Sequence, residues 1–299
     1  MIITLVGISG SGKSFVLQQI EEDIFNRDLN SNCDDYVLLR ANWEMSVFKL
    51  LIRKLKRSLN RSVKSILFNE TKAEDVEKFK KVCDEERSGN IYYLEDPCDP
   101  KTFYETAKAF LTEHKKKKQV VITIDHIALV RDILGNKKKS MDDLVEYINS
   151  LKKEFSNVSF IILSQMNREI EGRSDVRFLA PQRGDIYNSD TMYHISDIVL
   201  AIHNPYKLRH EKYMLVNPDR YSYLTEHMEN SANKTTNFKT FNRLFWHYMK
   251  LREVNDDNEV QDIHIEYFNK KLADQGIDSK KQMKDSDLFS SDNESDVPF

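Results

Sequence analysis

The residues best suited to chemistry lie at the start of the chain, where GISGSGKS (residues 7–14) has the spacing G-x-x-x-x-G-K-S. Glycines at these positions let backbone N–H groups surround phosphate oxygens, and the N-terminus of a following helix adds partial positive charge. In such a loop Lys13 reaches the β and γ phosphates of a nucleotide, and the hydroxyl of Ser14 holds Mg²⁺. The residues expected to bind the nucleotide are Gly7, Ser9, Gly10, Ser11, Gly12, Lys13 and Ser14.

The sequence around this loop supplies the strand and the helix that a phosphate loop requires. Residues 2–6 form a continuous apolar run of strand length. After the loop, Phe15, Val16, Ile20 and Ile24 fall near one face of a helix. The alternative is an ordinary glycine-rich turn, and the strand and helix on either side argue against it.

Two carboxylates follow predicted strands and could complete the site. Residues 120–125 form an apolar strand that ends at Asp125, which could hold Mg²⁺ through water; the alternative role for this aspartate is a helix cap. A second strand, residues 36–40, leads to Glu44, which could orient the water that attacks the γ phosphate. From the pattern alone Glu44 is one candidate among several, because a glutamate after a strand is more often a solvated cap.

The alternation of strands and helices predicts the fold class. A short strand at residues 91–96 precedes a helix at about residues 101–117, and a helix at residues 141–155 precedes a strand at residues 158–165. Repeated alternation of this kind predicts a three-layer α/β fold with a mainly parallel central sheet. Ligands in such folds bind at the carboxyl ends of the strands, so the phosphate loop, Glu44, Asp125 and Gln165 should gather at one edge.

Composition bounds the class of protein. The chain has 299 residues, of which 40% are hydrophobic, and only eight glycines and six prolines, which favours one large folded domain. We expect this domain over residues 1–270 and a disordered acidic tail over residues 271–299, which holds five acidic and no basic residues from Asp285 onward. No stretch has the length of a membrane span, and the three cysteines lack metal spacing and are expected as free thiols, so a cytoplasmic protein is predicted.

Several segments resemble one family, the DnaB-type replicative helicases. RANWEMS (residues 40–46) resembles the family's S-L-E-M segment, VVITIDHIALVRD (120–132) resembles I-V-I-D-Y-L-Q-L, and FIILSQMNREIEGR (160–173) is similar to A-L-S-Q-L-N-R-x-x-E-x-R. GDIYNSDTMYHISDIVLAIHN (184–204) and YMKLRE (248–253) resemble two later segments. The matching segments keep the family's order and cover roughly residues 1–268.

The resemblance implies a RecA-like P-loop ATPase fold and a role for each candidate residue. It implies that Glu44 activates water, that Asp125 supports Mg²⁺, and that Gln165 senses the γ phosphate of ATP and passes its state to the following loop. Lys250 and Arg252 resemble the pair that is inserted into a neighbouring subunit's nucleotide site. The alternative for Lys250 and Arg252 is a pair of exposed charges on a strand.

The loop over residues 174–190 falls where the family grips single-stranded DNA. Arg177, Arg183, Tyr187 and Asn188 are the candidate contacts, although the loop departs from the family pattern. Tyr187 replaces an arginine, Asn188 replaces a glutamate, and Asp190 replaces a glycine. Tyrosine can stack on bases and the two arginines can contact phosphates, while a solvated loop remains the alternative.

The two ends of the chain bear on assembly. DnaB-type helicases carry an amino-terminal domain before the ATPase, whereas this chain starts at the first ATPase strand, so we expect a hexameric ring formed through the ATPase faces or with help from a partner. The last residues, Asp296–Phe299, resemble the acidic tail of bacterial single-stranded DNA-binding proteins. They are expected to bind a replication protein, with a plain solubilising tail as the alternative.

The leading interpretation is an ATP-dependent helicase or translocase on single-stranded DNA, acting in replication in the cytoplasm of a bacterium and encoded by a phage. One alternative is a RecA-like ATP-binding accessory or loader protein without motor activity. A small-molecule or nucleotide kinase is the other, and the SQMNR segment after the strand at residues 158–165 argues against it.

Overall fold

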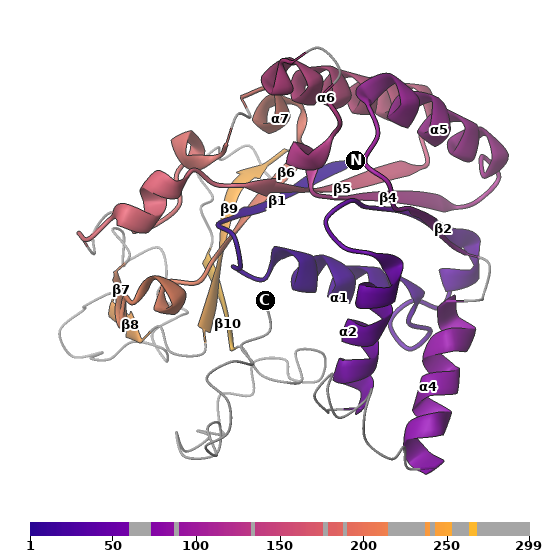
Figure 1. Cartoon of the computed structure of the whole chain (residues 1–299), viewed down its shortest axis with the longest axis horizontal. Helices are drawn as coiled ribbons and strands as arrows, with labels where there is room; N and C mark the ends of the chain where they lie inside the picture. The colour runs from indigo at the N-terminus through magenta and orange to yellow at the C-terminus, as the bar shows by residue number, and fades with distance from the viewer. Residues whose placement is uncertain are drawn as a thin grey trace.

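A computed structural model describes residues 1–59, 73–86, 90–132, 135–175, 179–187, 190–214, 237–239, 243–252 and 263–267. Its centre is an eight-stranded sheet in the order β10-β9-β6-β1-β5-β4-β2-β3 (Figure 1). The strands of this sheet are β1 (Ile2–Gly7), β2 (Tyr36–Asn42), β3 (Ile91–Leu94), β4 (Gln119–Asp125), β5 (Val158–Gln165), β6 (Ile198–His203), β9 (Arg243–Leu251) and β10 (Ile263–Tyr267).

Six neighbouring strands of the sheet run parallel, namely β6, β1, β5, β4, β2 and β3. At the other end of the sheet, β9 pairs with β6, and β10 pairs with β9, in antiparallel fashion. Parallel strands need crossover connections, and helices provide them on both faces of the sheet. The helices are α1 (Lys13–Phe25), α2 (Val47–Leu59), α4 (Ala73–Glu86), α5 (Pro100–Glu113), α6 (Lys137–Glu154) and α7 (Asp190–Ile195). The predicted three-layer fold with a mainly parallel sheet is therefore confirmed.

The helices divide between the two faces as Figure 1 shows, with α5, α6 and α7 above the sheet and α1, α2 and α4 below it. Each face has its own core. Fully buried Phe103 and Phe160 belong to the cluster under α5 and α6, and Leu5 and Leu163 to the cluster over α1. The central strands are apolar on both faces because both faces are covered.

A buried ion pair fixes α1 on the sheet. Glu21 on α1 lies 2.9 Å from the guanidinium of Arg40 on β2, and both side chains are almost fully buried. The hydroxyl of Thr123 on β4 donates to the other oxygen of Glu21 at 2.6 Å. A charge removed from water is tolerated only when its hydrogen bonds are made. The carboxylate therefore sets the position of α1 relative to β2 and β4.

Element boundaries differ modestly from those expected from the sequence. The helix predicted at residues 101–117 begins at Pro100, because Asp99 accepts hydrogen bonds from the backbone N–H groups of Lys101 and Thr102, and it ends at Glu113. The predicted strand at residues 36–40 continues to Asn42.

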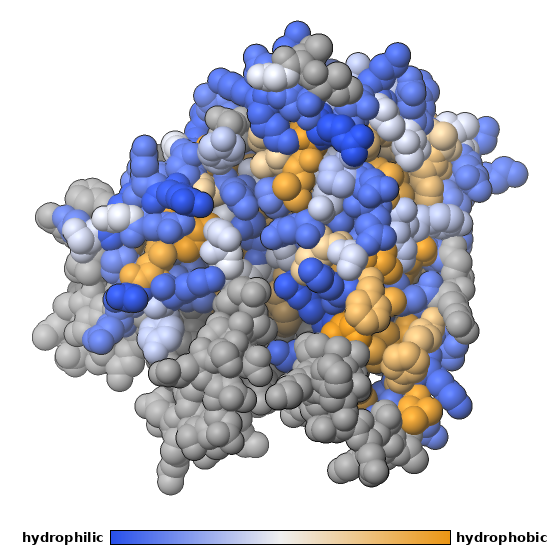
Figure 2. Space-filling view, viewed as in Figure 1, coloured by the Kyte–Doolittle hydropathy of each residue, from blue (hydrophilic) through white to orange (hydrophobic). Residues whose placement is uncertain are grey.

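Outside the main sheet, β7 (Lys212–Met214) and β8 (Asn237–Lys239) pair as a two-stranded antiparallel ribbon between β6 and β9 in the sequence. No helix in the described part of the chain is long and apolar enough to cross a membrane. Figure 2 shows a largely hydrophilic face with apolar side chains gathered near α2 and α4, where Phe48 and Phe79 are exposed.

Candidate active site

The phosphate loop connects β1 to α1 at the carboxyl edge of the sheet. Gly10 and Gly12 adopt left-handed backbone angles, with φ of 70° and 95°, which favour glycine. The ammonium group of Lys13 is buried and donates hydrogen bonds to the carbonyls of Gly7 and Ile8, at 2.9 and 2.8 Å. The loop thus curls around its own lysine, as a loop that encloses a phosphate does.

Gly7 is fixed by a close approach between strands rather than by its backbone angle. A Cβ atom built on Gly7 would lie 2.6 Å from the carbonyl oxygen of Ile202 on β6 and 2.4 Å from the hydroxyl of Ser11. The first glycine of the motif therefore lets β6 approach β1 where the phosphate loop begins.

The acidic residues predicted from the sequence lie beside this loop. Ser14 donates a hydrogen bond to the carboxyl group of Asp125. Asp125 pairs in register with Asn42 of β2, and the backbone N–H of Glu44 donates to the carbonyl of Asp125 at 3.1 Å. Asp125 is buried whereas Glu44 is exposed. The structure thus places one carboxylate against the proposed Mg²⁺ ligand Ser14 and the other where water can reach it.

The buried charges of the site perturb one another. Burial raises the pKa of Asp125 to about 7, against the effect of its hydrogen bond from Ser14. Burial also lowers the pKa of Lys13 to about 8, and the carboxylates of Asp125 and Glu44 oppose this shift. Both groups lose part of their preference for the charged state because hydration is lost. A bound metal ion and phosphates would restore that preference.

Gln165 ends β5 and connects the phosphate loop to the segment that follows β5. It pairs in register with Gly7 of β1, and its backbone carbonyl accepts a hydrogen bond from the N–H of Tyr187 at 2.9 Å. Met166 also forms a bridge with Ile186. A movement of Gln165 would therefore be transmitted directly to the loop that holds Tyr187.

His126 joins the site although sequence reasoning did not single it out. Its Nε2 atom lies 3.4 Å from Nε2 of Gln165, in an arrangement in which the amide donates to the ring. Its side chain is buried, and this burial lowers its pKa although the nearby carboxylate of Glu44 opposes the shift. The one available signal was its position directly after Asp125.

Four buried polar atoms around the phosphate loop have no hydrogen-bond partner among the described residues. They are the hydroxyl of Ser11, Oδ1 of Asn42, Oδ1 of Asp125 and Nδ1 of His126. Buried polar atoms are satisfied in the great majority of cases, so a cluster of exceptions requires an explanation. A carboxylate oxygen and a hydroxyl are also ligands suited to Mg²⁺. These residues therefore fit a nucleotide with its metal ion.

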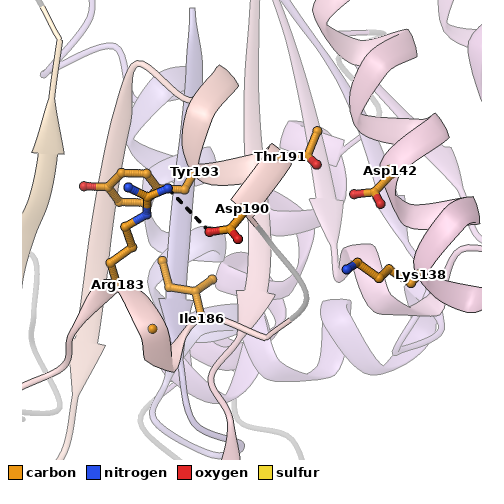
Figure 3. Close-up of a pocket in the computed structure, with 8 residues that line it drawn as sticks. Lys138, Asp142, Arg183, Ile186, Asp190, Thr191 and Tyr193 are labelled. Carbon is orange, nitrogen blue, oxygen red and sulfur yellow. Dashed lines mark hydrogen bonds and ion pairs between the residues drawn. The ribbon is translucent and has the colours of Figure 1, made fainter.

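The loop predicted to grip DNA is described only in part, since Arg177 and Asn188 lie outside the described residues. Arg183 is held within the chain, with its guanidinium 4.6 Å from the ring centre of Tyr193, 3.4 Å from Asp190 and 3.0 Å from Nε2 of His194 (Figure 3). Tyr187 is exposed. The structure thus presents Tyr187 to solvent and keeps Arg183 at the surface of α7.

A cavity of about 290 Å³ adjoins this loop, apart from the phosphate loop. Figure 3 shows that Lys138 and Asp142 of α6 face Arg183, Asp190 and Tyr193 across it. Its lining combines two cations with two carboxylates, so it carries no clear preference for an anion or a cation.

Lys250 and Arg252 lie at the opposite edge of the sheet from the phosphate loop. Lys250 donates to the carbonyls of Tyr193 and His194 at 2.6 and 2.9 Å, and the guanidinium of Arg252 donates to the carbonyl of His194 at 2.8 Å. The backbone N–H of Arg252 bonds to Asp197, whose own N–H bonds to Ile2 at the start of β1.

Lys250 pairs in register with Val199 of β6, which pairs with Thr4 of β1, so its backbone lies level with a point three residues, about 10 Å, before Gly7. Its ammonium group and the guanidinium of Arg252 are turned toward the carbonyls at the end of α7. These contacts turn both cations away from their own phosphate loop, and their action on the nucleotide site of another subunit stays a prediction.

Comparison with known proteins gives a consistent result. The family model described as the DnaB-like helicase C terminal domain matches residues 1–240. A solved ATPase domain aligns with a TM-score of 0.62 at 15% identity, over 88% of this chain and 79% of that one.

A DnaB-like replicative helicase, solved in a study of its interactions with primase, aligns with a TM-score of 0.60 at 15% identity, over 88% of this chain but 55% of that one. A KaiC-like protein from Pyrococcus horikoshii aligns with a TM-score of 0.46 at 14% identity, over 86% of this chain and 82% of that one. No curated protein matches the sequence. The first two alignments confirm the RecA-like P-loop ATPase fold.

Proposed function

We propose that this chain, which belongs to the family of DnaB-like helicase C-terminal domains, hydrolyses ATP to move along single-stranded DNA during replication in a bacterial cytoplasm. The observation that carries the proposal is the hydrogen bond from Tyr187 to the carbonyl of Gln165. It ties the loop proposed to grip DNA to the strand end that adjoins the phosphate loop. Hydrolysis and strand contact can then be coupled through a single strand end.

ATP hydrolysis follows from the arrangement of this chain's own side chains. Lys13 and the N–H groups of the phosphate loop hold the phosphates, and Ser14 and Asp125 would hold Mg²⁺, which would screen the phosphate charge when bound. Glu44 orients a water molecule and takes its proton as the water oxygen bonds to the γ phosphorus. The bond between that phosphorus and the bridging oxygen breaks, which releases ADP and phosphate.

Gln165 would respond to the γ phosphate through its side chain and to the DNA loop through its backbone. In this proposal the side-chain amide of Gln165 contacts both the γ phosphate and the ring of His126. Loss of the γ phosphate removes the first of these two contacts, so the amide shifts. The shift reaches Tyr187 through the hydrogen bond to the Gln165 carbonyl. Tyr187 stacks on a base, and Arg183 leaves Asp190 to bind a backbone phosphate.

A ring of copies completes each nucleotide site. Lys250 and Arg252 are held at the carbonyls that end α7 and not at their own phosphate loop. A cation placed near the γ phosphate from a neighbour stabilises the charge that develops in the transition state. We propose that six copies form this ring through their ATPase faces. The tail residues Asp296–Phe299 lie outside the described residues, and their binding to a replication protein stays a prediction.

A second candidate is an ATP-binding accessory or loader protein without motor activity. One observation favours it, namely that the loop's cation Arg183 is paired with the chain's own Asp190, where the resembling family carries a glycine. An aspartate beside the strand would repel phosphates. This candidate predicts slow ATP turnover that DNA does not change.

Movement along DNA can be tested by displacement of streptavidin from the end of a biotinylated single-stranded oligonucleotide. We expect ATP-dependent displacement by the wild-type chain. Glu44→Gln should keep ATP binding but lower hydrolysis at least about 100-fold, since a positioned base contributes that much, and should displace nothing. Glu154→Gln is the matched control, because it makes the same substitution at an exposed carboxylate at the end of α6, where Glu154 pairs with Lys108. This variant should behave as wild type. Equal displacement by a Glu44→Gln protein that has lost hydrolysis would refute the coupling of movement to hydrolysis, whereas unchanged hydrolysis would refute the role of Glu44.

A further inference from the structure

A segment beyond the phosphate loop also reaches the nucleotide site. Strands β1 and β6 run parallel and adjacent, with Val6 opposite Ala201, and the Gly7 position lies against the carbonyl of Ile202. Parallel neighbours end at the same edge of a sheet. The chain that leaves β6 after His203 therefore emerges beside the phosphate loop.

A well-defined turn holds this segment in place. The side chain of Asn204 accepts a hydrogen bond from the backbone N–H of Lys207 at 3.2 Å, and the N–H of Leu208 donates to the carbonyl of Pro205 at 3.0 Å. The turn closes at Arg209, which takes a left-handed angle with φ of 65°. Side-chain capping and a closed backbone ring restrict the place from which Lys207 projects.

Lys207 projects onto the phosphate loop itself. Its ammonium group donates a hydrogen bond to the carbonyl of Gly10 at 3.0 Å, across 197 positions of sequence. Gly10 lies at the centre of the glycine-rich loop, in the left-handed conformation that such a loop requires. A flexible lysine side chain that reaches this carbonyl can also reach a phosphate cradled by the loop.

Lys13 and Lys207 bring two ammonium groups to one loop. Lys207 contributes to the lowered pKa of Lys13, and burial lowers the pKa of Lys207 itself, with Glu171 opposing that shift. Like charges held in proximity repel each other, and a multiply charged anion relieves the repulsion. The triphosphate of ATP supplies such an anion.

We infer that Lys207 is a further nucleotide-binding residue, which transfers its hydrogen bond from the Gly10 carbonyl to the phosphate tail of bound ATP. The inference rests on the proposed function and adds a cation from the same subunit to the phosphate loop. It places this cation on the segment after β6, so that β6 as well as β1 and β5 responds to the nucleotide.

The test is the affinity of the full chain for the magnesium complex of adenylyl imidodiphosphate, a non-hydrolysable ATP analogue, measured by titration calorimetry. Lys207→Gln should raise the dissociation constant about fivefold, as expected for a charged contact that is partly exposed. Lys207→Arg keeps the charge and should bind within about twofold of wild type by the same reasoning. Arg209→Asn removes an exposed charge from the same turn and should bind as wild type.

The outcomes separate the inference from the proposed function. If wild type binds the analogue and Lys13→Ala does not, the nucleotide site stands, and Lys207→Gln then decides the inference alone. Unchanged affinity in Lys207→Gln overturns the inference, as does an equal loss in Lys207→Gln and Lys207→Arg, which would indicate a contact of shape rather than charge. Failure of wild type to bind the analogue overturns the proposed function together with the inference.

Discussion

At the scale of single residues, the nucleotide site is organised around charges that the fold has partly dehydrated. Asp125 is buried against Ser14, and Lys13 is buried against backbone carbonyls. Burial disfavours the charged form of each group, and a bound ligand of opposite charge would favour the charged form again. The chain thus gives up some stability at this site in return for affinity toward a metal ion and phosphates.

This cost should be visible as a pH dependence of stability. Unfolded Asp125 titrates near pH 4, and the folded group at about pH 7. Between these values the folded chain keeps a proton that the unfolded chain has lost, so the contribution of Asp125 to stability falls as pH rises from 4 to 7 and stays low above 7. We expect Asp125→Asn to gain stability relative to nucleotide-free wild type over this window, by up to roughly 4 kcal/mol.

Urea unfolding of both proteins at pH 5, 6 and 8, without nucleotide and with chelator, measures this difference. Parallel stability curves for wild type and Asp125→Asn would show that Asp125 is not dehydrated in the folded chain.

The sequence allowed the placement of the candidate residues to be predicted where strand order dictates it, while their roles stay predictions. The phosphate loop, Glu44, Asp125 and Gln165 gather at one edge because parallel strands end there. His126 and Lys207 were missed for a physical reason. The first is a strand-end residue whose ring orientation depends on packing, and the second reaches the site through a turn 197 positions away from its partner Gly10.

At the scale of elements, the contact between β1 and β6 is the tightest constraint on the site. A side chain at Gly7 would collide with the carbonyl of Ile202, which is backbone and cannot rotate away. Gly7→Ala must therefore separate β1 from β6 or distort the phosphate loop.

We expect Gly7→Ala to lower the free energy of unfolding by about 1–3 kcal/mol, the usual effect of overpacking, and to weaken nucleotide binding. Gly172→Ala is the matched control, since a Cβ there meets no atom within 4 Å and should leave both properties unchanged. Thermal unfolding and titration with the ATP analogue check the two effects. A Gly7→Ala protein as stable as Gly172→Ala would contradict the close approach of the two strands.

Elements were predicted well where apolar runs or helical periodicity are long. Strands β1, β2, β4 and β5 and helices α5 and α6 lie close to their expected positions, and the differences arise at caps such as Asp99. The pairing of β9 with β6 was not predicted, because antiparallel pairing between distant segments leaves little local signal. The ribbon of β7 and β8 was missed for the same reason.

At the scale of the whole molecule, the phosphate loop and the two cations proposed to act on a neighbour lie toward opposite ends of the parallel strands. The phosphate loop lies at one edge, and Lys250 and Arg252 lie at the other, on the carbonyls that end α7. A head-to-tail ring brings the second edge of one copy to the first edge of the next, and its interface is heterologous. In the proposed ring, each nucleotide site would be completed by residues of two copies.

Mixing two inactive proteins tests this arrangement. Lys13→Ala lacks a working phosphate loop but keeps the cations, whereas the double variant Lys250→Ala, Arg252→Ala keeps the loop and lacks the cations. An equal mixture should recover about a quarter of wild-type ATP hydrolysis, because a quarter of random head-to-tail interfaces join an intact loop to intact cations. Activity no greater than the average of the two separate proteins would mean that Lys250 and Arg252 do not act across an interface.

We propose that ATP hydrolysis is coupled to single-stranded DNA through Gln165 and Tyr187. The most direct measurement is steady-state ATP hydrolysis by the purified chain with and without single-stranded DNA, at low salt where contacts to phosphates are strongest. We expect DNA to stimulate hydrolysis several-fold, and we expect Tyr187→Ala to reduce this stimulation while basal turnover is preserved. Slow turnover that DNA leaves unchanged would contradict it and would favour the accessory protein without motor activity.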